Sequence, residues 1–114
     1  MTKALHEAGA KLLLGTDCAT PYIVAGWSAH RELQLLVEAG LTPYEALRAG
    51  TVDAAAYLGD DFGAVRVGKR ADLVLVEANP LADVKNAARR VGVMVRGRWL
   101  PAADLQKRLD GSVR

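Results

Sequence analysis

A chain of 114 residues and 12.2 kDa has the size of one small domain, and it is 51% hydrophobic and 25% charged with a net charge of +2. These values are typical of globular proteins and exclude a disordered or collagen-like chain. No apolar run approaches the roughly twenty residues that cross a bilayer, and no basic and apolar leader stands at Met1, so we expect neither a membrane span nor an export signal.

Cysteine and charge usage restrict the partners further. The single cysteine, Cys18, excludes an intramolecular disulfide and suits reducing, cytoplasm-like conditions. The net charge is −2 over residues 1–57 and +4 over residues 58–114, and the few aromatic residues do not interleave with the arginines. We therefore expect no nucleic-acid partner. A basic-face binder stays open as a minor alternative, and it would use Lys85, Arg89, Arg90, Arg96 and Arg98.

The chain begins with a helix and a buried strand. Residues 2–8 form a short amphipathic pattern, and Gly9 supplies the permissive residue that ends a helix. The unbroken apolar run within residues 11–16 is typical of a strand covered on both faces, as in parallel sheets. Residues 18–27 then predict a loop of the length that active-site loops often have. This order indicates an α/β fold.

Three helices are expected next, over residues 28–40, 42–49 and 51–59. Ser28 is predicted to cap the first of them, which carries an apolar stripe at helical spacing. Thr42 and Glu45 have the spacing of a capping box, with Pro43 at the first helical position. Thr51 opens the third helix, and Gly59 ends it.

After Gly59 the pattern changes to short β-type runs. Strands are expected over residues 63–68, 71–76 and 91–95. Arg96-Gly97-Arg98 indicates a tight turn, and a terminal helix is predicted from Pro101 through Leu109.

Asp17 is the first candidate for chemistry. An acidic side chain just past the carboxyl end of a buried parallel strand stands where α/β folds place ligands and catalytic groups. A turn or cap role is the alternative, because Asp after Gly-Thr is common in turns. His30, in the first turn of the following helix, can reach the same edge of the sheet, although a surface histidine is equally compatible. Tyr22 and Trp27 belong to the loop between them.

A complete metal site is not expected from this chain alone. A catalytic zinc site needs about three protein ligands, and the candidates are His6, Asp17, Cys18 and His30. His6 belongs to the helix before the strand and should point away from the strand's carboxyl end.

Six motifs occur in a fixed order: Leu14-Gly15-Thr16-Asp17, His30-x-Glu32-Leu33, Glu38-Ala39-Gly40-Leu41-Thr42-Pro43-x-Glu45-Ala46-Leu47, Thr51-x-x-Ala54-Ala55, Gly63-x-Val65-x-x-Gly68-Lys69-x-Ala71-Asp72-Leu73-Val74 and Asn79-Pro80-Leu81. In this order they resemble the carboxyl-terminal third of the amidohydrolase superfamily, in its imidazolonepropionase-like and prolidase-like branch. The resemblance covers nearly the whole chain.

The resemblance implies a metal-dependent hydrolase. Its fold would be a (β/α)8 TIM barrel with a small composite β-sandwich, and its substrates small amides, cyclic amides or dipeptides, cleaved at a C–N bond with one or two divalent metals, often zinc. On that template residues 1–58 hold the last strand and closing helices of the barrel, with residues 11–16 as that strand. Residues 59–114 hold the sandwich portion and the terminal helix.

The resemblance also assigns roles to single residues. Asp17 corresponds to the aspartate that ligates a metal and acts as general base, whereas Lys69 and Asp72 are structural in the family. His30 is a candidate substrate contact by its position. Asp53 stands where the family usually has Asn, and we expect only a local effect on helix capping.

The remaining ligands of the family lie before the region that this chain covers. The chain is therefore expected to need the missing amino-terminal barrel portion, or to self-associate. A non-catalytic α/β module that pairs with another chain is the second hypothesis.

Overall fold

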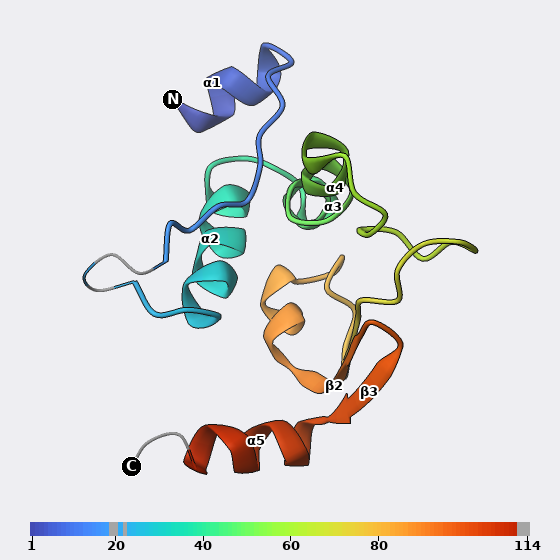
Figure 1. The fold of residues 1–114 in the computed structure, drawn as a ribbon. Coiled ribbons are helices and arrows are strands. Elements are labelled where there is room, and N and C mark those ends of the chain that lie inside the picture. The colour runs from blue at the N-terminus through green and yellow to red at the C-terminus, as the bar shows by residue number, and fades with distance from the viewer. Residues whose placement is uncertain (19–20, 22, 112–114) are drawn as a thin grey trace.

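The computed structural model describes residues 1–18, 21 and 23–111, and Figure 1 shows the order of its elements. They are α1 (Thr2–Glu7), α2 (Trp27–Glu38), α3 (Pro43–Ala49), α4 (Val52–Leu58), β1 (Leu73–Val76), the 3-10 helix η1 (Val84–Ala88), β2 (Arg90–Val95), β3 (Arg98–Pro101) and α5 (Ala102–Gly111). The predicted helices are confirmed to within a few residues at each end, and η1 was not expected.

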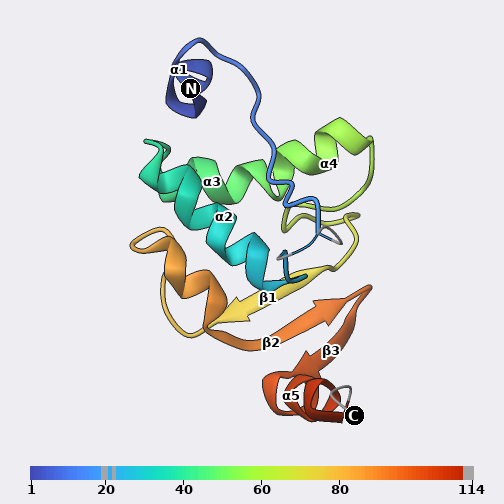
Figure 2. The ribbon, with the colours of Figure 1, turned by 90° about the vertical axis from the view of Figure 1, so that its left-hand side faces the viewer.

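The elements form layers, which Figure 2 shows edge-on. Helices α2, α3 and α4 with η1 lie over one face of the antiparallel sheet β1-β2-β3, and α5 contacts β2 and β3 on the far side. Helix α1 lies apart at the amino-terminal end. The molecule is therefore α/β, as predicted.

Residues 11–16, which were predicted to form a strand, pair with no strand in the described part of the chain. The segment is extended but belongs to no strand, and the first β-type pairing is an isolated bridge at Cys18. A strand is defined by hydrogen bonds to a neighbour, and this backbone meets helices instead: the Leu14 N–H donates to the Ala49 carbonyl at the end of α3 at 3.3 Å. The apolar run was predicted to be covered on both faces, and the side chains of Leu12, Leu13 and Leu14 are half-buried.

The start of α2 differs from the prediction. Gly26, with φ of 80°, is the N-cap, and no side chain caps the helix. Ser28 therefore lies inside the first turn, and its Oγ is buried without a hydrogen-bond partner among the described residues. Ser was a plausible cap by residue type, but the left-handed backbone at Gly26 moves the helix start two residues earlier.

The capping box at α3 is confirmed. The Glu45 N–H donates to Thr42 Oγ1 at 3.2 Å, and Glu45 Oε2 accepts from the Thr42 N–H at 2.8 Å. Two backbone donors that would lack a helical partner are thus satisfied. Helix α3 supplies Ala46 and Ala49 to the core, so its start fixes the position of two buried side chains.

Replacing Thr42 by Ala should lower the free energy of unfolding by about 1 kcal/mol, because it removes this cap. Ser28→Ala is the matched control: it removes a hydroxyl that no described group hydrogen-bonds, so we expect no loss, or a small gain, of stability. Urea unfolding of the two variants checks the difference. A Ser28→Ala loss as large as that of Thr42→Ala would contradict the assigned helix starts.

The sheet differs from the prediction in one strand. Residues 63–68 form turns, and the third strand is β3. The tight turn is confirmed: Val95 pairs with Arg98, and both residues between them have positive φ, 49° at Arg96 and 79° at Gly97. Such two-residue loops match the twist of a hairpin, so β2 and β3 pair directly and the terminal helix begins only at Ala102.

Charged residues fasten the turns of residues 59–70 to the sheet. Arg70 pairs with both Asp60 (3.1 Å) and Asp72 (2.6 Å), and Lys69 pairs with Asp61 at 2.9 Å. Asp72 also accepts the Arg96 N–H at 2.7 Å, and this backbone hydrogen bond together with Arg70 holds the pKa of Asp72 below its usual value. Lys69 and Asp72 thus have structural contacts.

The buried core is small and lies among the helices. It consists of Leu33, Leu36, Leu41, Ala46, Ala49 and Val84. The accessible surface is 8301 Å², against about 6,000 Å² for a typical folded monomer of this mass. Apolar side chains of β1, Val74 and Leu75, are more than half exposed. Of the helices in the described ranges, none has the length and apolar character to cross a membrane.

Candidate functional site at the end of the extended segment

Asp17 stands at the end of the extended segment, exposed, with a left-handed backbone (φ 50°). Among non-glycine residues, Asp and Asn adopt this conformation most readily. Just before it, the Gly15 N–H donates to Glu32 Oε1 at 3.0 Å. The segment that ends at Asp17 is therefore tied to α3 through Leu14 and to α2 through Gly15.

The contact of Glu32 with Gly15 was not predicted from the sequence. Glu32 was noted only as part of the His30-x-Glu32 motif, and Gly15 lies 17 residues away along the chain. Its second carboxylate oxygen, Oε2, is buried without a hydrogen-bond partner among the described residues. No spacing of residue types marks the contact of Glu32 with Gly15, because its two residues lie far apart along the chain.

His30 contacts the sheet. Its Nε2 lies 3.2 Å from an Arg90 guanidinium nitrogen on β2. Burial lowers the pKa of His30 below its ordinary value, and the positive charge of Arg90 lowers the pKa further. A neutral ring that accepts from Arg90 fits both observations, so the imidazole links the helical layer to the sheet.

This contact predicts a pH dependence of stability. The unfolded His30 has a pKa near 6.5, and the folded value is lower, so between the two values the unfolded chain binds more protons. The contribution of neutral His30 to the free energy of unfolding is then fully present above about pH 6.5, and it is lost as the pH falls through that window. Unfolding free energies measured from pH 7.5 to 5 should fall more for the wild type than for His30→Gln, which has no charge to gain. Parallel curves would contradict the contact.

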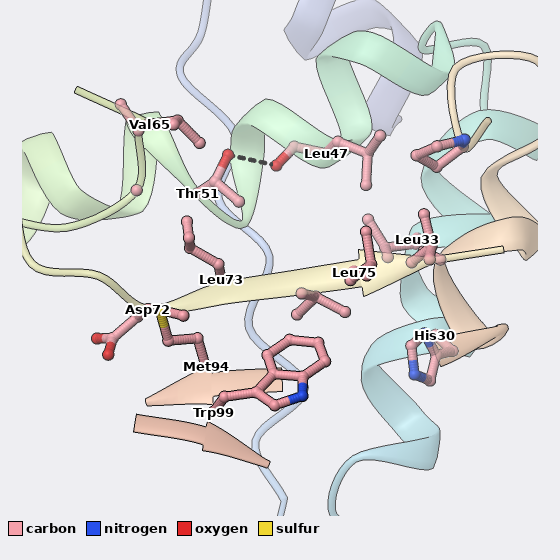
Figure 3. Close-up of a pocket in the computed structure, with 16 residues that line it drawn as sticks. His30, Leu33, Leu47, Thr51, Val65, Asp72, Leu73, Leu75, Met94 and Trp99 are labelled. Carbon is pink, nitrogen blue, oxygen red and sulfur yellow. Dashed lines mark hydrogen bonds between the residues drawn. The ribbon is translucent and has the colours of Figure 1, made fainter. Parts of the chain in front are cut away.

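A cavity of about 680 Å³ lies between the helical layer and β1, and Figure 3 shows its lining. Its walls are mostly apolar side chains such as Leu33, Leu73 and Met94. His30 from α2 stands at one end, and Asp72 at the other points its carboxylate away from the middle. Asp17 is not among the residues that line it. The described lining therefore suits apolar groups.

The other candidates are dispersed. His6 Nε2 contacts Glu45 Oε1 at 3.2 Å, Cys18 is exposed, and Trp27 is 70% exposed at the start of α2. Tyr22 lies outside the described residues. Among residues 1–18, 21 and 23–111, no three His, Cys, Asp or Glu side chains come together to hold a metal ion. The described residues therefore do not form a whole metal centre.

Comparison with known proteins identifies the family. The model of the amidohydrolase family matches residues 1–100. An ochratoxinase from Aspergillus niger is 40% identical over 83 residues, 69% of this chain, and an imidazolonepropionase from a Geobacillus species is 39% identical over 89 residues, 68% of this chain. A solved structure from Bifidobacterium longum, provisionally described as a prolidase, superposes on 99% of this chain with a TM-score of 0.79 and 36% identity.

These relatives are much longer than this chain. The matches cover 16% of the ochratoxinase, 20% of the imidazolonepropionase and 30% of the Bifidobacterium protein. Because the family model matches most of the chain, and sequence and structure agree on the branch, the chain belongs to the amidohydrolase family, in the branch of the imidazolonepropionases and prolidase-like proteins.

Proposed function

We propose that the chain is the carboxyl-terminal portion of a metal-dependent amidohydrolase that cleaves C–N bonds of small amides, cyclic amides or dipeptides. The observation that carries the proposal is the placement of Asp17 at the end of a half-buried segment that two helices hold, within a chain that matches the family over residues 1–100. Ochratoxinase, imidazolonepropionase and prolidase relatives support amide hydrolysis as a class. They do not select one substrate.

In this proposal residues 1–58 belong to a (β/α)8 barrel, and residues 11–16 are its last strand. Two observations support it. The backbone of these residues is extended and half-buried yet pairs with no strand, as expected when its neighbours belong to another part of the protein. The surface area of the chain also exceeds that of a typical monomer of its mass. Residues 59–114 would form part of the β-sandwich.

The proposed chemistry uses the Asp17 carboxylate twice. A divalent metal, zinc by family resemblance, would supply Lewis acidity that lowers the pKa of a water molecule to about 7. Asp17 would help to bind it and would accept a proton from the attacking water as the C–O bond forms. Asp17 then returns that proton to the leaving nitrogen as the C–N bond breaks. His30 is proposed as a substrate contact by position, although its contact with Arg90 occupies one ring nitrogen.

A chimera tests the proposal. The segment of the Geobacillus imidazolonepropionase that aligns with this chain would be replaced by residues 1–114, and hydrolysis measured on that enzyme's substrate and on a panel of dipeptides and cyclic amides. We expect turnover by the chimera with bound zinc, and neither stoichiometric zinc nor turnover by the 114-residue chain alone. A folded, zinc-loaded chimera without turnover on any substrate would contradict the proposal. It would favour the non-catalytic module, for which the incomplete ligand set is the supporting observation.

A further inference from the structure

We propose that Glu32 is a positioning residue for Asp17. Its carboxylate holds the backbone just before Asp17 and so sets the direction of that side chain. The catalytic meaning of this role rests on the proposed function, but the contact itself can be tested without it.

The anchoring uses two consecutive amides. The Leu14 N–H donates to Ala49 of α3, and the Gly15 N–H donates to Glu32 of α2. Two helices therefore hold consecutive residues of the segment, α3 at Leu14 and α2 at Gly15. Of the two, the bond to Glu32 has a carboxylate acceptor, and hydrogen bonds to charged acceptors are the stronger kind. It is also the shorter, 3.0 Å against 3.3 Å.

Packing fixes Leu14 independently of Glu32. A Cβ added at Gly50, just after α3, would lie 3.1 Å from a Leu14 methyl carbon, so the Leu14 side chain already lies close against the end of that helix. Gly15 has no side chain, and nothing lies within 4 Å of where its Cβ would be. The Gly15 amide, two residues before Asp17 with its left-handed backbone, is therefore the group through which α2 holds the segment.

The environment of Glu32 is unlike that of an ordinary surface glutamate. Glu38, on the same helix, pairs with Arg31 at 3.0 Å with both side chains exposed. Glu32 instead is half-buried, and its Oε2 has no hydrogen-bond partner in the described part of the chain. A buried carboxylate oxygen without a partner is costly.

The test is amide hydrogen exchange by NMR on the 114-residue chain, with Leu14 as the internal reference. In Glu32→Ala we expect the Gly15 amide to exchange about tenfold faster relative to Leu14, and the Asp17 amide shift and HN–Hα coupling to change. Glu32→Gln keeps an oxygen that can accept from Gly15 and should restore both readouts. Glu38→Ala, the matched control, should leave them unchanged.

A variant that unfolds would accelerate exchange everywhere, so Glu32→Asp provides a milder change that keeps the charge and shortens the reach. The proposal is overturned if the Gly15-to-Leu14 ratio and the Asp17 signals are unchanged in folded Glu32→Ala or Glu32→Asp, or if Glu38→Ala changes them equally.

The chimera separates this inference from the proposed function. If it is right, Glu32→Ala lowers kcat more than it raises KM, and Glu32→Gln recovers most of the kcat. If the NMR effects appear but Asp17→Asn leaves turnover intact, Glu32 still orients Asp17 and the proposed function fails. If Asp17 is essential and Glu32→Ala changes neither exchange nor kcat, Glu32 is not a positioning residue.

Discussion

Replacing Asp17 by Asn should lower kcat of the chimera by about 10²- to 10⁴-fold, the usual contribution of a positioned general base. The amide has the shape of the carboxylate but cannot accept a proton from water near neutral pH, so the loss falls on the chemical step. KM should change much less, because the substitution leaves substrate contacts in place. Initial rates over a range of substrate concentrations give both constants, and bound zinc is measured on the same samples.

Asp53→Asn is the matched control, since it makes the same chemical change in an aspartate that pairs with Arg48 at 3.0 Å in the first turn of α4. We expect kcat to stay near the wild-type value, with a small loss of stability from a partly exposed ion pair. Equal losses in both variants would mean that any aspartate-to-asparagine change disturbs the chimera. No loss in Asp17→Asn would remove Asp17 from the proposed mechanism.

The helices were predictable because their signals are local. The Thr42–Glu45 box and the positive-φ stop at Gly59 occur within a few residues of the ends that they define. The Arg96-Gly97 turn is of the same kind, since a two-residue loop with left-handed backbone specifies the hairpin by itself. In each case the information needed lies inside one short stretch of sequence.

Strand pairing was less predictable. Alternation over residues 63–68 indicated a strand, but those residues turn and are fastened by ion pairs of Lys69 and Arg70 to aspartates. The four-residue β3 was not predicted because it directly follows the hairpin turn and ends in Pro101, a residue type that also begins helices. A period-2 pattern shows which side chains share a face and not which backbone they pair with. The division of the chain at residues 58 and 59 stays a prediction.

The candidate site shows the same limit. Asp17 could be singled out from the sequence, because its place after a buried run is a local feature, although its role stays a proposal. The contact of His30 with Arg90 joins residues 60 positions apart, and that of Glu32 with Gly15 joins residues 17 apart. The spacing of residue types in the sequence predicts neither contact, and both are seen only in the structure.

Replacing Gly63 by Ala should destabilise the chain by about 2–4 kcal/mol, because strain in the left-handed backbone and overpacking add. Gly63 has φ of 85°, and its added Cβ would lie 2.5 Å from the Thr51 carbonyl oxygen and 3.0 Å from the Ala55 Cβ. The oxygen belongs to the backbone at the start of α4 and cannot rotate away. Urea unfolding, followed by far-UV circular dichroism, measures the loss.

Gly68→Ala is the control that separates the cost of steric overlap from the cost of backbone strain. Gly68 also has φ of 85°, but nothing lies within 4 Å of its added Cβ, so only the backbone strain of about 1 kcal/mol is expected. The difference between the two variants then measures how closely residue 63 packs against the start of α4. If the variants lose the same stability, the turns of residues 59–70 do not hold that close contact in solution, and Gly63 serves only as a left-handed turn residue.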